Sequence, residues 1–177
     1  SRAALRFRSR SSAETREAAR RLSAAIDAIG ETRAIACVIG LTGPLGAGKT
    51  EWVRGMAEGL GVDTRLVTSP TFVIASEYPG RRPLAHVDFY RLESEAELEA
   101  TGFMDLLDPG RIVAIEWADR FPGALPEERI EVRIARDAVE PECAREVELS
   151  ALGPIAARVV RHFEREMKVE EERAPWR

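Results

Sequence analysis

The sequence predicts one α/β domain, in which helices cover both faces of a mostly parallel sheet with antiparallel strands at its edges. Apolar runs of strand length alternate along the chain with segments whose apolar residues recur at helical spacing, as in three-layer α/β/α folds. The length of 177 residues suits a single domain. We expect this domain to cover residues 1–168 and a charged tail to cover residues 169–177.

The N-terminal part of the chain is expected to form a strand, a helix and a buried strand in that order. Residues 5–8 alternate between apolar and polar, which is typical of a short strand. Ser11 precedes Glu14 at capping-box spacing, and the helix that it opens is expected to end near Gly30. Residues 35–41 form a continuous apolar run with β-branched members, which indicates a buried parallel strand.

The remainder of the chain continues this alternation. A second capping box joins Ser94 to Glu97 and predicts short helical material that reaches Leu107. A closing helix is expected from about Pro154, and the charged end of the chain from Glu170 is expected to fray. Further strands are expected at residues 84–90, 111–115, 130–135 and 146–149.

The composition is that of an ordinary globular protein and excludes several classes of function. A net charge of −4 and a pI near 5.4 argue against binding bulk nucleic acid through a basic surface. Two cysteines, Cys37 and Cys143, make a zinc site and a disulfide framework improbable. No apolar run is long enough to span a membrane, and the arginine-rich residues 1–10 lack the apolar core of a signal peptide. We therefore expect a reduced, cytoplasmic setting.

Residues 43–50, Gly-Pro-Leu-Gly-Ala-Gly-Lys-Thr, match the phosphate-loop pattern G-x-x-x-x-G-K-[ST] at every position. They follow a predicted strand and precede a predicted helix, which is the context that a phosphate loop requires. Glycines let several backbone N–H groups point at one phosphate, and the helix start adds the positive end of its dipole. Lys49 is expected to reach the β- and γ-phosphates and Thr50 to bind Mg²⁺. The loop therefore predicts binding of a nucleoside triphosphate with Mg²⁺, and its hydrolysis.

Glu116 is the second candidate site residue, because it follows the predicted strand at residues 111–115. P-loop proteins use this position to place a carboxylate near Mg²⁺ and the attacking water. Many buried strands also end in a charged residue at the surface, so the phosphate loop upstream decides in favour of a functional role. Trp117, the next residue, either caps the core or takes part in the site.

Asp88 is the third candidate and lies in the segment His-Val-Asp-Phe-Tyr-Arg at residues 86–91. On a strand, His86 and Asp88 share one face with Tyr90. Asp88 could bind Mg²⁺ through water or polarise the nucleophile, and it could equally pair with Arg91 or face solvent. A lone histidine such as His86 is more often structural than catalytic.

The segment Thr-Ser-Pro-Thr at residues 68–71 is the fourth candidate. Its turn chemistry and central position are compatible with a switch loop in which Ser69 or Thr71 offers a hydroxyl to the metal or the γ-phosphate. A plain connecting loop explains the same residues equally well.

Together these segments resemble the TsaE family, the small ATPases of bacterial tRNA threonylcarbamoyladenosine synthesis. The order and spacing agree over about residues 5–150, and the combination of the phosphate loop with the His-x-Asp-x-Tyr-Arg and Glu-Trp segments is specific to the family. The matching segments are residues 43–50, Ser69-Pro70-Thr71, residues 86–91 and Ile115-Glu116-Trp117, with further similarity at residues 97–105 and Leu125-Pro126.

The resemblance implies a P-loop NTPase-like fold that binds ATP and Mg²⁺ and hydrolyses ATP weakly. Family members act with the proteins TsaB and TsaD, which build the threonylcarbamoyl group and attach it to an adenosine of tRNA. TsaE resets that complex between turnovers. The resemblance therefore implies TsaB and TsaD as partners, tRNA as an indirect partner through the complex, and no membrane.

The resemblance also implies roles for individual residues. Lys49, Asp88 and Glu116 are assigned to catalysis, and Thr50 and Glu116 to the metal. The ATP contacts implied are Ser12, Ala13, Gly43, Gly46, Ala47, Gly48, Lys49, Thr50, Glu51 and Arg145. Two positions depart from the family pattern. Glu51 stands where the family often has a second threonine, so its carboxylate must point outward, and Ala144 replaces the glycine that commonly precedes the late arginine.

Three other readings of the phosphate loop are open. A small-molecule kinase needs an acceptor pocket and a mobile lid with arginines, for which Arg81-Arg82 is the one candidate. A signalling GTPase would carry an N-K-x-D segment, which the sequence lacks. A structural subunit could bind nucleotide without turnover, and sequence does not separate slow hydrolysis from none.

Overall fold

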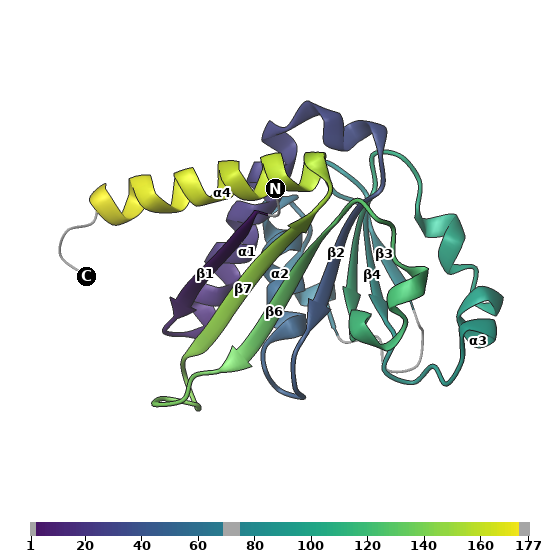
Figure 1. Cartoon of the computed structure of the whole chain (residues 1–177), viewed down its shortest axis with the longest axis horizontal. Helices are drawn as coiled ribbons and strands as arrows, with labels where there is room; N and C mark the ends of the chain where they lie inside the picture. The colour runs from purple at the N-terminus through teal and green to yellow at the C-terminus, as the bar shows by residue number, and fades with distance from the viewer. Residues whose placement is uncertain (1–2, 69–74, 174–177) are drawn as a thin grey trace.

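The chain, a computed structural model, is described over residues 3–68 and 75–173 (Figure 1). Within these ranges the predicted alternation of strands and helices is present. The strands are β1 (Ala4–Ser9), β2 (Cys37–Thr42), β3 (Ala75–Tyr78), β4 (Leu84–Asp88), β5 (Ile112–Glu116), β6 (Arg129–Arg136) and β7 (Arg145–Leu152). The α-helices are α1 (Ser12–Ala28), α2 (Lys49–Gly59), α3 (Glu95–Ala100) and α4 (Pro154–Arg173), and short 3₁₀ helices connect them: η1 (Gly30–Ala34), η2 (Thr64–Leu66), η3 (Phe103–Leu106), η4 (Ala118–Arg120) and η5 (Pro122–Ala124).

The strands form one sheet in the order β1-β7-β6-β2-β5-β4-β3. At its centre β2 pairs in parallel with β5 and β6, and β4 pairs in parallel with β5. Towards the edges β3 is antiparallel to β4, and β7 is antiparallel to both β6 and β1. The predicted mostly parallel centre with antiparallel edge strands is thus confirmed.

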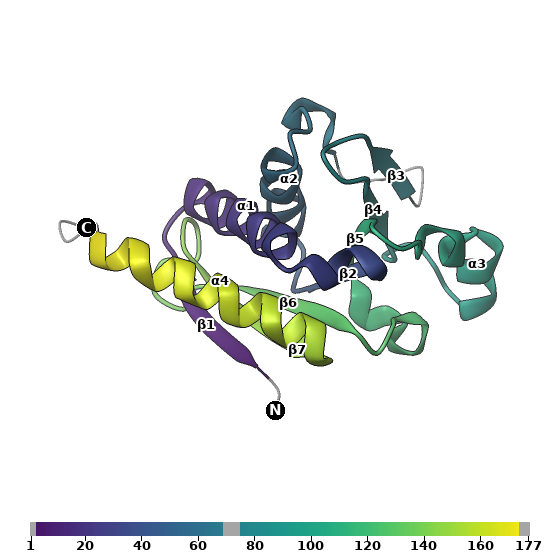
Figure 2. The same ribbon diagram turned by 90° about the horizontal axis from the view of Figure 1, so that it is seen from above.

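Helices α1, α2 and α4 lie on one face of the sheet (Figure 2). Their buried residues, such as Leu22 of α1, Trp52 of α2 and Phe163 of α4, pack with the inward side chains of the strands in one apolar cluster. A second cluster covers the opposite face of β2, β5 and β4, where Phe89 contacts Phe103 edge-to-face at 5.3 Å between ring centroids. The sheet is therefore covered on both faces in its parallel part.

The outer face of the antiparallel part is polar. Arg6 of β1 and Glu148 of β7 occupy paired positions on this face, and their side chains form an ion pair at 2.8 Å. The layer formed by the second apolar cluster therefore covers only the parallel part of the sheet. The strands that it covers, β2, β4 and β5, end near the phosphate loop.

Local sequence signals account for the helix starts. The Ser11 hydroxyl accepts the Glu14 N–H at 3.1 Å, and the Ser94 hydroxyl accepts the Glu97 N–H at 3.1 Å. Each serine satisfies a backbone donor that the helix itself leaves unpaired. Both predicted capping boxes are thus confirmed as helix starts.

Two predicted boundaries are wrong. The strand expected over residues 84–90 ends at Asp88, because the Asp88 carboxylate accepts the Tyr90 N–H at 2.8 Å and turns the chain. Tyr90 therefore leaves the strand face that His86 and Asp88 share. At the C-terminus, α4 continues to Arg173, past the expected start of the tail at residue 169, and Glu170 pairs with Arg21 of α1.

Two other predictions concern the switch loop and the absence of a membrane span. The proposed switch-loop residues Ser69 and Thr71 lie outside the described residues. Over the described ranges, each helix is too short or too polar to cross a membrane.

Helices α1 and α2 lie side by side because α2 presents glycine at the contact. A Cβ atom added to Gly55 would lie 2.2 Å from the Arg16 carbonyl oxygen and 2.7 Å from the Ala19 Cβ. One turn later, a Cβ on Gly59 would lie 2.8 Å from the Arg20 carbonyl oxygen. The backbones approach this closely only because both residues lack a side chain.

We predict that Gly55→Ala destabilises the fold, although alanine is normally the better helix former. Forcing α1 and α2 apart costs about 2 kcal/mol, as overpacking of a filled core does, and lowers the midpoint of thermal unfolding by about 4–8 °C. Circular dichroism on heating measures this. Gly30→Ala is the control, because its Cβ would meet no atom within 4 Å. Equal midpoints for both variants would contradict the packing described.

Candidate functional site

Three parallel strands end in register at the same edge of the sheet. Glu116 at the end of β5 pairs with Leu41 of β2 on one side and with Asp88 of β4 on the other. The chain leaves β2 after Thr42 and enters the glycine loop directly. The loop and both candidate carboxylates are therefore neighbours, because the strands that carry them run parallel.

The glycine loop has a backbone that only glycines adopt without strain. Gly43, Gly46 and Gly48 have φ of 144°, 75° and 110°. A Cβ atom at Gly43 would also lie 2.1 Å from the Ile134 carbonyl oxygen of β6, so the loop is seated on the neighbouring strand. Gly48 is the N-cap of α2 and has no side chain to occupy the first helical N–H groups. Such a loop, followed by a helix start, fits a phosphate group.

Lys49 lies across the mouth of this loop. Its ammonium donates to the carbonyl oxygens of Gly43 at 2.6 Å and Pro44 at 2.9 Å, and it lies 4.1 Å above the ring of Trp117. The residue is only 5% exposed. Burial lowers the pKa of the Lys49 amine, while the neighbouring carboxylates of Glu116 and Asp88 favour its charged form.

Thr50, Glu116 and His86 form a continuous polar contact beneath the loop. The Thr50 hydroxyl donates to the Glu116 carboxylate, at 3.0 Å from Oε1 and 3.1 Å from Oε2. The His86 Nε2 atom lies 2.6 Å from Oε2 of the same carboxylate. Glu116 is 4% exposed and His86 is fully buried. The sequence placed Thr50 and Glu116 together but did not predict the contact of His86.

Asp88 is next to this cluster and half-buried. Burial raises the pKa of its carboxyl group, and the nearby charge of Glu116 acts in the same direction. The Tyr90 N–H, His86 and Lys49 oppose that shift. Asp88 of β4 is paired in register with Glu116 of β5, so both carboxylates lie at the same edge of the sheet.

Trp117 has an uncommon backbone conformation. It is the single non-glycine residue with positive φ in the described part of the chain, with φ 57° and ψ 38°. For an L-amino acid this left-handed conformation costs about 1–2 kcal/mol. The ring lies against Lys49 on one side and packs on Tyr90, with 4.9 Å between ring centroids. Trp117 therefore contacts the site and does not merely cap the core.

Glu51 is neutralised by two arginines. Its carboxylate accepts from Arg16 of α1 at 2.6 Å and from Arg54 at 3.0 Å. The Glu51 carboxylate is thus directed at arginines of α1 and α2, and the partner on α1 could not be found from local spacing. Ser12 and Ala13 are exposed at the start of α1, one turn before Arg16. Because Arg16 contacts Glu51, the starts of α1 and α2 lie together.

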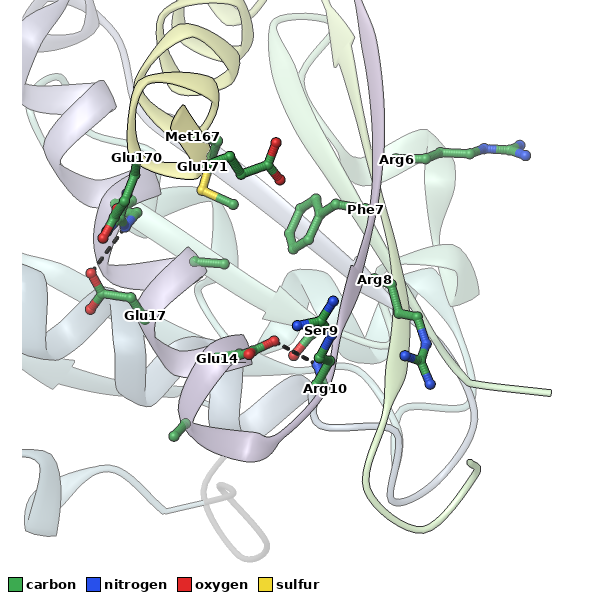
Figure 3. Close-up of a pocket in the computed structure, with 13 residues that line it drawn as sticks. Arg6, Phe7, Arg8, Ser9, Arg10, Glu14, Glu17, Met167, Glu170 and Glu171 are labelled. Carbon is green, nitrogen blue, oxygen red and sulfur yellow. Dashed lines mark hydrogen bonds and ion pairs between the residues drawn. The ribbon is translucent and has the colours of Figure 1, made fainter. Parts of the chain in front are cut away.

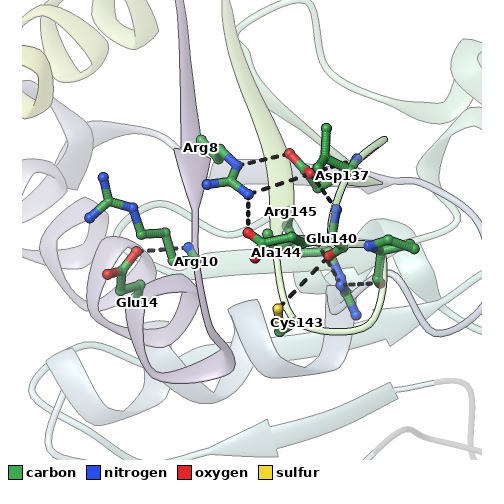
Figure 4. A network of polar contacts seen from close by, with 10 residues as sticks. Arg8, Arg10, Glu14, Asp137, Glu140, Cys143, Ala144 and Arg145 are labelled. Carbon is green, nitrogen blue, oxygen red and sulfur yellow. Dashed lines mark hydrogen bonds and ion pairs between the residues drawn. The ribbon is translucent and has the colours of Figure 1, made fainter.

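Arg145 holds the glycine loop from the side of β7. Its guanidinium donates to the Ala47 carbonyl oxygen at 2.8 Å and to the Pro141 and Ala144 carbonyl oxygens at 2.9 and 2.8 Å. The turn before Arg145 is fixed by Asp137, which pairs with Arg8 of β1 at 2.9 Å (Figure 4). Hydrogen bonding from Arg8 holds the pKa of Asp137 well below its usual range. The edge strand thus supports the loop indirectly.

The donor set at the loop suits Mg²⁺ bound together with a nucleotide. Thr50 and Glu116 offer oxygen atoms, which this cation prefers. Within the described residues no group of three or more His, Cys, Asp or Glu side chains could hold a metal. A cation at Thr50 and Glu116 would take its other ligands from phosphate and water, which is the usual arrangement for Mg²⁺ in nucleotide sites.

A separate pocket of about 830 Å³ lies between β1, α1 and the end of α4 (Figure 3). Phe7 and Met167 form its apolar wall, and its rim carries arginines and glutamates from all three elements. Of the predicted nucleotide contacts, Ala13 alone borders it. The pocket is therefore distinct from the glycine loop.

Comparison with known proteins agrees with the fold. A crystal structure of Bacillus subtilis YdiB superimposes with a TM-score of 0.68 at 31% identity, covering 94% of this chain and 97% of that one. The shared architecture is a P-loop NTPase-like fold.

Several sequence relatives are named TsaE. The tRNA threonylcarbamoyladenosine biosynthesis protein TsaE of Bacillus subtilis is 44% identical over 117 residues, which cover 66% of this chain and 70% of the relative. The protein of that name from Haemophilus influenzae is 37% identical over 129 residues, 72% of this chain and 78% of the relative. The family model for threonylcarbamoyl adenosine biosynthesis protein TsaE matches residues 9–147, from the end of β1 into β7. The chain therefore belongs to the TsaE family.

Proposed function

We propose that this chain binds ATP with Mg²⁺ at the glycine loop and hydrolyses the nucleotide as an accessory protein of tRNA threonylcarbamoyladenosine (t⁶A) synthesis. The observation that carries the nucleotide part is the contact of Thr50 with Glu116 at the start of α2. It joins a hydroxyl and a carboxylate beside a loop shaped for phosphate. Family membership supports the pathway.

In this proposal each site residue has one task. The backbone N–H groups of residues 43–50 and the charge of Lys49 bind the phosphates, and Arg145 keeps the loop in shape through Ala47. Thr50 and Glu116 hold Mg²⁺, whose charge polarises the phosphate oxygens when it is bound. The exposed start of α1 at Ser12 and Ala13 lies beside the start of α2, where it can contact the rest of the nucleotide.

Asp88 is proposed to orient and deprotonate the attacking water. The carboxylate is half-buried next to Glu116, and burial raises the pKa of its carboxyl group, which makes the carboxylate a better proton acceptor. Its orientation is fixed by the Tyr90 N–H at 2.8 Å. A fixed acceptor with a raised pKa suits the proton transfer that accompanies water attack.

The proposed hydrolysis is slow in the isolated chain. Phosphoryl transfer is accelerated mainly by positive charge at the transferring group, and an arginine finger contributes about 10³–10⁵ in rate. Lys49 supplies one such charge. Arg145 beside the loop donates to backbone carbonyl oxygens, and Arg136 is a second arginine beside the loop, next to Gly46. We therefore expect faster turnover inside a complex that adds charge or orders the site.

The proposed partners are the TsaB and TsaD proteins, and tRNA is reached through their complex. Relatives that share more than a third of the aligned residues are named for tRNA threonylcarbamoyladenosine biosynthesis, which supports a place in this pathway. Because the substrate of the pathway is tRNA, the proposed place of action is the cytoplasm. In this proposal, ATP hydrolysis serves to reset the complex between its cycles.

We predict that Lys49→Ala lowers ATP hydrolysis by about 10²–10³-fold, as loss of one stabilising donor does in other enzymes. Release of inorganic phosphate in the presence of TsaB and TsaD measures the rate. Lys168→Ala is the matched control, because Lys168 is an exposed lysine that pairs with Glu164 on α4. Wild-type rates in Lys49→Ala would show that the loop does not perform the reaction. Small hydroxyl-bearing acceptors added to the assay test the kinase alternative, which requires a phosphorylated acceptor in place of free phosphate.

A second prediction concerns the pathway. With TsaB, TsaD, tRNA, ATP, threonine and bicarbonate, wild-type protein should support many rounds of tRNA modification per complex. Glu116→Ala should stop the reaction after about one round, because the carboxylate that holds Mg²⁺ is removed. Mass spectrometry of digested tRNA nucleosides counts the rounds, and Glu164→Ala on α4 is the control. If Glu116→Ala and wild type gave equal yields, the assignment of the site would be wrong.

A further inference from the structure

The Glu116 carboxylate is held at two separate points. Thr50 donates its hydroxyl proton from α2, and His86 approaches from β4 with 2.6 Å between Nε2 and Oε2. Because an ionised carboxylate only accepts hydrogen bonds, Nε2 of His86 carries the proton in this contact. Two donors on different elements fix both the position and the plane of one carboxylate.

Among the described residues, the His86 side chain makes this one hydrogen bond and is otherwise enclosed. The residue is fully buried, and its Nδ1 atom has no hydrogen-bond partner in residues 3–68 and 75–173. A buried polar side chain with a single bond to a site carboxylate is poorly explained by packing alone.

We infer that His86 is a positioning residue for the proposed Mg²⁺ site, acting through Glu116 on Thr50. This inference rests on the proposed function. A threonine hydroxyl has one proton and two lone pairs. While its proton is directed at a fixed carboxylate, its lone pairs are left available for a cation. The bond from His86 thus orients two metal ligands, Glu116 directly and Thr50 through Glu116. Loss of such an outer partner commonly weakens metal affinity by about 10–100-fold.

Two substitutions separate this role from simple packing. In His86→Gln the amide nitrogen is three bonds from Cβ, as Nε2 is in histidine, so the donor to Glu116 can be kept. In His86→Asn the amide nitrogen is one bond closer to the backbone, so the donor is withdrawn. Both variants place an uncharged amide in the same buried position, and both should unfold at similar temperatures in EDTA.

The test measures binding of a fluorescent ATP analogue while Mg²⁺ is titrated. We expect the Mg²⁺ concentration for half-maximal binding to rise by about 10–100-fold in His86→Asn and by less than about threefold in His86→Gln. In a Glu116→Gln background, His86→Asn should have no further effect, because His86 acts through that carboxylate. Equal shifts in the two His86 variants, or a full effect of His86→Asn without Glu116, would overturn the inference.

A spectroscopic measurement tests the contact in the unmodified chain. Only His86 and His162 are present, so ¹⁵N-histidine labelling gives two imidazole spectra. His86 should show an Nε2–H signal protected from solvent exchange, and Glu116→Gln should shift it, while the ring of His162 on α4 serves as internal control. Absence of a protected signal would also overturn the inference. If wild-type protein bound no ATP analogue with Mg²⁺ at all, the proposed function would fail instead.

Discussion

The register of three parallel strands is the constraint on which the rest of this molecule depends. Because β5 pairs with β2 and β4 at the same height, Glu116 lies between Leu41 and Asp88, and the chain turns into the glycine loop directly after Thr42. A shift of β5 by one residue would direct the Glu116 side chain to the opposite face of the sheet. Strands β2 and β5 are buried along almost their whole length and also carry the loop and Glu116, so the same pairing builds the core and the site.

The site concentrates charge in the interior and compensates it locally. Lys49 and Glu116 are both almost completely buried, and each would be costly to bury alone. Lys49 is paired with two carbonyl oxygens and an aromatic ring, and Glu116 with a hydroxyl and an imidazole. Each buried group therefore has several weak partners in place of one strong ion pair. The carbonyl oxygens that pair with Lys49 can be exchanged for phosphate oxygens without leaving its charge unpaired.

The parts of the structure that depend on local sequence were predictable, and those that depend on distant contacts were not. The glycine loop, both serine caps and the placement of Glu116 follow from short patterns, because each is set by neighbours in the chain. The contact of His86 with Glu116 joins residues 30 positions apart, and the pairing of Arg16 with Glu51 joins residues 35 apart. The spacing of apolar residues within a helix or strand does not indicate such distant pairs. The strand expected to reach residue 90 ended at Asp88 because its side chain, not the apolar pattern, set the turn.

The same distinction explains why Trp117 could not be assigned from sequence. Its ring is directed at Lys49 only because its backbone takes a left-handed conformation that the residue type disfavours. Strain of this kind persists where surrounding contacts offset it, and here these include the ammonium of Lys49, the ring of Tyr90 and the second apolar cluster. Tyr90 is 48% exposed, so two successive contacts connect the phosphate loop to the surface of the molecule. A nucleotide that drew Lys49 towards its phosphates would remove one of the contacts of Trp117, which also packs against the second apolar cluster. Because Trp117 contacts Lys49 directly, binding of a phosphate at the loop would alter the contacts that offset the backbone strain of Trp117.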